Sequence, residues 1–196
     1  MKAILISIRP EWVAKILNGE KTIEIRKTDP KCNLPIDVYI YCTKGGEENL
    51  IHNRNGWLMS EFATTYVNGE RVTHNYKGKV VAKFTLDVVY EYDIKEKSTW
   101  VDSDFAEVMK KLSAMSLYEI NKYAGNHFYA WHISDLVIFD EPMELSELKF
   151  RKEYHSCEKC PHAEDENDIV VCENRCIELL TVKRAPQSWQ YVEVQE

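Results

Sequence analysis

Charged residues are concentrated in a segment that otherwise has the pattern of a buried strand. Residues 19–27 read Gly-Glu-Lys-Thr-Ile-Glu-Ile-Arg-Lys, so that two isoleucines alternate with Glu24 and Arg26, and Lys21 precedes them. Because successive strand side chains point to opposite faces, one face is apolar and the other carries a carboxylate and a guanidinium. The pattern fits either a half-buried strand with a solvated polar face and a Glu/Arg pair, or a polar site.

The three charged side chains differ in the chemistry they can perform. A desolvated lysine, or one beside another cation, has a lowered pKa, so Lys21 can act as a nucleophile or base with Glu24 as its proton partner. Arg26 is better suited to holding a planar carboxylate, a phosphate or a base edge through its fork of donors. The segment therefore offers Lys21 and Glu24 as candidate catalytic residues and Arg26 as a binding residue.

Further candidate ligand-binding residues lie elsewhere in the sequence. Trp131 and His132 belong to an expected late strand and offer a stacking face and a titratable group, of the kind used on splayed RNA bases. Strand alternation lets only one of them face a cleft, and the alternative places Trp131 in the core and His132 on the other face. Arg9 and Lys27 belong to a mildly basic stretch, 1–31, which fits either a phosphate-binding patch or ordinary surface lysines and arginines.

Four cysteines near the C-terminus have the spacing of metal ligands. They form Cys-x-x-Cys, eleven intervening residues and Cys-x-x-x-Cys, at Cys157, Cys160, Cys172 and Cys176. A tetrahedral structural zinc site is the leading interpretation, and its metal would order a polar, acidic loop that has no core of its own. The alternatives are replacement of one thiol by a nearby histidine, a thiol/disulfide pair, or an iron–sulfur cluster.

The histidines that could replace one of the four thiols are His155 and His162. Cys32 and Cys42 are expected to be ordinary buried or partly buried thiols. Four occupied cysteines leave no open coordination position, which makes catalysis by such a metal an unfavoured interpretation.

The charge of the chain is unevenly distributed. The formal net charge is −7 over 196 residues, and residues 140–178 carry 12 acidic residues against 5 lysines and arginines, which leaves 20 of each sign elsewhere. The acidity is thus local and does not exclude a nucleic-acid ligand for the rest of the chain. No apolar run reaches membrane-spanning length, and the short one at residues 3–8 is read as a strand, so a cytoplasmic protein is expected.

Sequence signals predict a mixture of strands and short helices. Strands are expected at 3–8, 22–27, 37–43, 79–92, 128–133, 136–139 and 189–194, and helices at 10–19, 104–112 and 117–124. The layout lacks the regular alternation of a doubly wound parallel sheet, and it contains no glycine-rich phosphate loop or nucleophile elbow. An α+β fold built on a small, mixed and mostly antiparallel β-barrel with short flanking helices is predicted.

With Gly19, Lys21, Glu24 and Arg26 in place, the segment reads Gly-x-Lys-x-x-Glu-x-Arg and resembles the signature of the ASCH domain, a branch of the PUA-like superfamily. The resemblance extends through the preceding helix, the strand beginning at Gly78 and the late strand at 129–136. It implies a PUA-like pseudo-barrel whose cleft accepts RNA or a nucleotide-like ligand. One branch consists of acetylcytidine amidohydrolases, which are similar here but carry threonine in place of Glu24.

These observations give a domain plan and two functions. Residues 1–145 are assigned to the ASCH/PUA-like domain with an inserted excursion at 45–78, residues 146–180 to the zinc segment, and 181–196 to a terminal strand that returns to the barrel. Binding of RNA or a modified nucleotide is expected, with a hydrolase acting on an acylated nucleoside or RNA, an amidohydrolase or ribonuclease, as the alternative. The acidic zinc segment is also a candidate contact for a protein partner.

Overall fold

The computed structural model describes residues 1–45, 51–52, 58–59, 63–67, 70–74, 76–94, 104–154 and 176–194, and for residues 51–74 it describes the backbone alone. The elements in chain order are β1 (Lys2–Ile8), α1 (Pro10–Leu17), β2 (Ile23–Arg26), β3 (Ile36–Cys42), β4 (Ile51–His52), β5 (Leu58–Met59), β6 (Ala63–Val67), β7 (Glu70–His74), β8 (Val80–Leu86), β9 (Val89–Asp93), α2 (Asp104–Ser113), α3 (Leu117–Ala124), β10 (His127–His132), β11 (Ser134–Met143), a 3-10 turn η2 (Leu145–Glu147), β12 (Lys149–Tyr154), β13 (Cys176–Thr181) and β14 (Trp189–Glu193).

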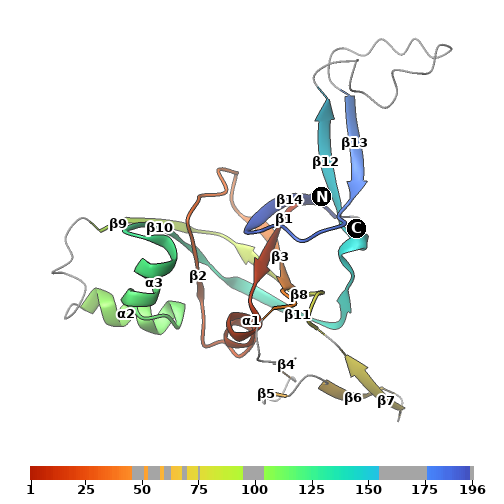
Figure 1. Ribbon diagram of the computed structural model, residues 1–196, viewed down its shortest axis with the longest axis horizontal. Helices are drawn as coiled ribbons and strands as arrows, with labels where there is room; N and C mark the ends of the chain where they lie inside the picture. Colours follow the sequence, from red (N-terminus) through yellow and green to blue (C-terminus); the bar gives the residue numbers. More distant parts are fainter. Residues whose placement is uncertain are drawn as a thin grey trace.

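Two sheets form the body of the protein. The larger has seven strands in the order β11-β8-β3-β1-β14-β12-β13, and the smaller has three in the order β2-β10-β9 (Figure 1). Strand β1 pairs parallel with β3 and antiparallel with β14, so the larger sheet is mixed, as the sequence predicts. The fold is therefore α+β.

The predicted barrel is not what the described residues show. Within them the seven-stranded sheet runs from β11 to β13 without closing. One reason is that the 79–92 segment, expected as one strand, divides into β8 in the large sheet and β9 in the small one. A second is that the β12–β13 hairpin extends away from the body, and its register with β14 is a single pair, Lys149 with Glu193 (Figure 1).

Helix α1 and the turn that follows it set the direction in which the chain enters β2. Pro10 occupies the first turn, where its missing N–H costs nothing, and Val13, Ile16 and Leu17 are buried on one face. Gly19 follows the helix with a φ of 73°, a left-handed conformation that favours glycine. This turn aims the chain directly into β2.

Helices α2 and α3 cover one face of the small sheet. Met109, Leu117 and Ile120 pack in one buried cluster with Ile25 and Phe128, which are side chains of β2 and β10. The predicted Ser116 cap of α3 is present, because its side chain accepts from the Glu119 N–H while the Glu119 carboxylate accepts from the Ser116 N–H. The helices thus occupy the apolar face of β2 and leave its charged face toward the large sheet.

Candidate functional site

The charged face of β2 is buried. Lys21, Glu24 and Arg26 are 2%, 7% and 4% exposed, so the alternative of a solvated Glu/Arg pair is wrong and the polar side chains are enclosed. One Glu24 oxygen lies 3.2 Å from Lys21 Nζ, and the other lies 2.9 Å from Arg26 Nη2. We call these three residues the charge triad; it holds two cations and one anion away from water.

Local structure fixes the position of Lys21. The positive φ of Gly19 turns the chain so that the Glu20 and Lys21 amides both donate to the Lys15 carbonyl, at 2.9 and 3.1 Å. Lys21 Nζ then donates to the Ser113 carbonyl at 2.8 Å, at the C-terminal end of α2. A cation is favoured there by the negative end of the helix dipole.

The pKa of Lys21 is lowered from its ordinary value. Burial is the largest cause because it disfavours the charged amine, and Arg26 and Lys15 lower the pKa further, whereas Glu24 opposes the shift. Lys21 Nζ also lies 5.4 Å from the centre of the Trp12 ring, close enough for a cation–π contact. The site therefore contains a lysine whose neutral form is more accessible than in water.

Arg26 connects the small sheet to the large one. Its Nη2 donates to the Ser7 carbonyl at 2.9 Å, and its Nη1 lies 3.2 Å from Ser188 Oγ and 3.4 Å from the Ser188 carbonyl oxygen. Ser7 belongs to β1, and Ser188 immediately precedes β14. Together with the Glu24 contact, four of the five guanidinium N–H groups have a partner. The Nε–H has none among the described residues.

Two buried N–H donors near the charge triad have no partner among the described residues: Arg26 Nε and Trp131 Nε1. Trp131 is fully buried, lies opposite Glu24 in the β2–β10 register, and packs against Trp189 with ring centroids 5.7 Å apart. Paired residues in an antiparallel ladder share a face, so both donors lie on the charged face of the sheet. An unsatisfied buried donor costs about 1–3 kcal/mol, which a bound acceptor would recover.

The other sequence candidates are not part of the charge triad. His132 faces away and lies 2.7 Å from Asp87 through its Nδ1. Lys27 is exposed, with its Nζ 5.2 Å from the centre of the Tyr123 ring, and Arg9 is exposed at the N-cap of α1. Of the Trp131 and His132 pair, the tryptophan lies on the charged face, and it is also part of the core.

Other residues of the site have no sequence signal. Ser113 and Ser7 contribute backbone carbonyls, which any residue type could supply, and Ser188 and Trp189 come from the far end of the chain. Trp12 reaches the site only through the packing of α1. Such contacts depend on tertiary structure and leave no local pattern.

The predicted zinc ligands lie largely beyond what can be described. Cys157, Cys160 and Cys172 are outside the described residues, as are His155 and His162, and Cys176 is described only by its backbone as the first residue of β13. Within the described part of the chain, no group of histidine, cysteine or acidic side chains has the arrangement of a metal site. Cys42 is buried and Cys32 partly buried, both as free thiols.

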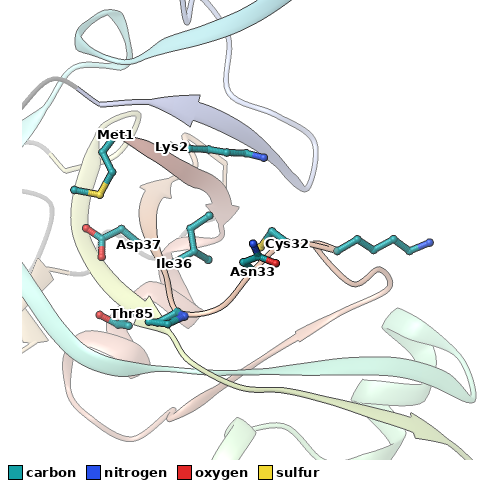
Figure 2. A pocket seen from close by; sticks show the side chains of 9 residues that line it. Met1, Lys2, Cys32, Asn33, Ile36, Asp37 and Thr85 are labelled. Atoms are coloured by element: carbon teal, nitrogen blue, oxygen red, sulfur yellow. The ribbon is translucent and has the colours of Figure 1, made fainter.

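A hollow of about 760 Å³ lies elsewhere, between the start of β1 and the loop before β3. Figure 2 shows Lys2 above Cys32 and Asn33, with Asp37 and Thr85 to the left of these two residues. None of the charge-triad residues lines it, so this hollow is separate from the charged residues of β2.

Among the helices that the structure describes, none combines the length and hydropathy needed to span a membrane.

The solved structures similar to this chain include those of an ASCH protein from Zymomonas mobilis. ZmASCH from Zymomonas mobilis is 18% identical with a TM-score of 0.46, and the match covers 73% of each chain. A tyrosine-to-phenylalanine variant of ZmASCH is 17% identical with a TM-score of 0.47, covering 74% of this chain and 77% of that one. No curated protein shows a significant sequence match.

The family comparison covers most of the chain. The model of the ASCH domain matches residues 6–172, a range that begins in β1, includes the charge triad and ends at Cys172. The chain therefore belongs to the ASCH-domain family.

Proposed function

We propose that this protein binds RNA or a nucleotide-like ligand through a cleft at the charge triad. The observation that carries the proposal is the pair of buried, unpartnered donors, Arg26 Nε and Trp131 Nε1, beside a triad that has one more cation than anion. Phosphate oxygens and base edges supply the acceptors that such donors need. Family membership supports the same ligand class, because the ASCH resemblance is associated with RNA.

Aromatic side chains supply a second element of nucleotide recognition. Trp189 is only half-buried, packs against Trp131, and lies next to Tyr191 with ring centroids 5.6 Å apart. A base stacks on such a surface without sequence preference, and each stacked base contributes about 1–3 kcal/mol. We therefore assign anion and base-edge contacts to Arg26 and stacking to Trp189.

The test uses variants that remove donors while preserving shape. Trp131→Phe deletes the unpartnered N–H and keeps a buried ring, and we expect affinity for single-stranded RNA to fall about tenfold, as for one lost hydrogen bond. Trp189→Phe is the comparison, because it keeps an aromatic ring for stacking and the N–H that it deletes already donates to Thr28 at 2.9 Å; we expect a smaller loss of affinity for this variant. Fluorescence anisotropy against an RNA panel at low salt measures both, and undetectable affinity of the wild-type chain would refute the proposal.

A hydrolase is the second candidate, and the lowered pKa of Lys21 favours it. A neutral amine 3.2 Å from a carboxylate can take a proton from water or attack an acyl carbon, with Glu24 exchanging the proton. The substrate class would be an acylated nucleoside or RNA. Lys21→Ala and Glu24→Gln should abolish turnover at a temperature where circular dichroism shows each variant to be folded, and absence of wild-type hydrolysis of both substrates would eliminate this function.

We further propose that Cys157, Cys160, Cys172 and Cys176 bind a structural zinc ion. The β12–β13 register supports this, because Tyr154 lies opposite Cys176 and so brings the two ends of the cysteine segment together. The acidic charge of the same segment makes it a candidate surface for a protein partner. Elemental analysis and pull-down experiments test these two assignments.

A further inference from the structure

The charged face of the small sheet extends beyond the charge triad. Tyr129 of β10 lies opposite Arg26 of β2 on one side and opposite Glu91 of β9 on the other. Residues directly opposite one another in an antiparallel sheet share a face, so these three side chains form one row across the three strands. We call Arg26, Tyr129 and Glu91 the cross-strand row.

The cross-strand row passes from the interior to the surface. Arg26 is 4% exposed, Tyr129 is partly buried, and the Glu91 side chain is 62% exposed. Neighbouring strands lie about 4.8 Å apart, so the Cα atoms of Arg26 and Glu91 are separated by about 10 Å. The row therefore has an enclosed end and an open end, at a separation comparable to the width of a nucleobase.

Glu91 is held in place through one of its two oxygens. Its Oε1 accepts from the Tyr129 hydroxyl at 3.3 Å and lies 2.8 Å from His127 Nε2. The His127 ring in turn packs edge-on against the Tyr129 ring, with centroids 5.2 Å apart. Both polar contacts use Oε1, so the carboxylate is oriented by its neighbours while neither contact occupies Oε2.

The two ends of the row have opposite hydrogen-bonding character. Arg26 Nε is a buried donor without a partner among the described residues, whereas an ionised carboxylate such as that of Glu91 only accepts. A ligand that spans the row must therefore present an acceptor at one end and an N–H donor at the other. Bases with an exocyclic amino group do so, because a ring nitrogen or carbonyl oxygen accompanies the amino group on the same ring system.

The surroundings of the open end also contain carboxylates. His127 lies opposite Asp93 in the next pair of the register. Desolvation, followed by Glu91 and Asp29, raises the pKa of Tyr129, so Asp29 lies within electrostatic range of the row. A ligand oxygen is disfavoured beside the Glu91 carboxylate, whereas an amino group is favoured there.

We propose that Glu91 is a specificity-determining residue of the nucleotide site and accepts a hydrogen bond from the exocyclic amino group of the bound base, an inference that rests on the proposed function. Arg26 Nε donates to an acceptor of the same base, and Tyr129 lies between the two contacts. The ligand class is a nucleotide whose base carries an amino group, such as adenine or cytosine.

The test deletes the amino group from the ligand and the carboxylate from the protein. The ligand pairs are adenosine monophosphate with purine riboside monophosphate, and cytidine monophosphate with pyrimidin-2-one riboside monophosphate, and each second member lacks only the amino group. The variants are Glu91→Leu and the control Glu107→Leu, which removes an exposed glutamate from α2 on the other face of the small sheet. Isothermal titration calorimetry measures affinity, and circular dichroism establishes folding. If Glu91→Leu is unstable, Glu91→Gln takes its place, because it keeps the shape of the side chain and removes the charge.

In at least one pair, we expect wild-type protein to bind the amino-bearing nucleotide about tenfold more tightly than its analogue, as for one hydrogen bond to a charged group. The Glu107→Leu control should keep this preference. Glu91→Leu should bind the two members of that pair equally, and Glu91→Gln should show a smaller preference than wild-type protein.

The contrary results separate the inference from the proposed function. Equal wild-type affinities within both pairs would overturn the inference while leaving nucleotide binding intact. A preference that persists unchanged in the folded Glu91 variant would show that the amino group is recognised elsewhere, and would overturn the role of Glu91. Absence of wild-type binding to all four nucleotides would overturn the proposed function and the inference with it.

Discussion

Replacing Glu24 with glutamine tests the charge triad most sharply as a physical unit. The substitution keeps the size of the side chain but removes the only anion of the triad, which lies 3.2 Å from Lys21 Nζ and 2.9 Å from Arg26 Nη2. Both cations are nearly closed to solvent, so water cannot replace the lost charge. The folded state should therefore lose stability.

The magnitude follows from the geometry. At an effective dielectric constant of about 20, two unit charges 3 Å apart interact by about 5–6 kcal/mol, so the two contacts are large before compensation. Repulsion between the cations is present in both proteins, and Lys21 can lose its proton when Glu24 no longer opposes the lowering of its pKa. Removing one partner of a buried ion pair costs about 3–5 kcal/mol, which is the loss we expect in the free energy of unfolding.

Urea unfolding of Glu24→Gln and Glu91→Gln provides the comparison. Glu91 also has two polar contacts, His127 at 2.8 Å and Tyr129 at 3.3 Å, but its side chain is 62% exposed. Its loss should cost less than about 1 kcal/mol. A Glu24→Gln variant no less stable than the Glu91→Gln control would show that the triad is not a buried electrostatic unit, and the reasoning would fail.

Three further predictions concern the pH dependence, a helix cap and the cysteines. The pKa of Lys21 is lower in the folded chain than its ordinary value of 10.5, so the unfolded chain binds more protons between the two values. The stability of wild-type protein relative to Lys21→Met should therefore rise with pH in urea unfolding from pH 7 to 10. A flat or falling difference in stability would contradict the lowered pKa. Ser116→Ala should cost about 1 kcal/mol in thermal unfolding, because it removes the acceptor for the Glu119 amide of α3, and an unchanged midpoint would count against the cap. Elemental analysis of protein purified without chelator should find one zinc per chain, lost in Cys157→Ser, whereas metal-free protein would contradict the zinc site.

Local signals in the sequence predict several elements well. Pro10 and Gly19 bound a short helix, and the structure places α1 at residues 10–17 between them. Ser116 and Glu119 predict a capping box, which the structure confirms. Both signals depend on contacts within one turn of chain, which explains why sequence alone suffices there.

Features of the fold that depend on contacts between distant residues have no clear local signal in the sequence. The alternation over 79–92 continues through residues 87–88 without glycine or proline, so nothing in it marks the passage from β8 to β9. The polar face of β2 was equally consistent with solvent or a site, and its burial results from Ser7, Ser113 and Ser188, which lie on β1, at the end of α2 and before β14. The Lys-Glu-Arg spacing identified the charged residues, but their enclosure depends on the tertiary fold.

In the proposed complex, a ligand acceptor meets the unpartnered donors at the charge triad. The most direct measurement is a crystal structure of the protein soaked with uridine monophosphate. We predict ligand density with an oxygen within hydrogen-bond distance of Arg26 Nε, and a base near the Trp131–Trp189 pair. If the nucleotide lies only elsewhere in a saturated crystal, for example in the hollow beside Lys2, or does not bind at all, the charge triad is not the ligand site.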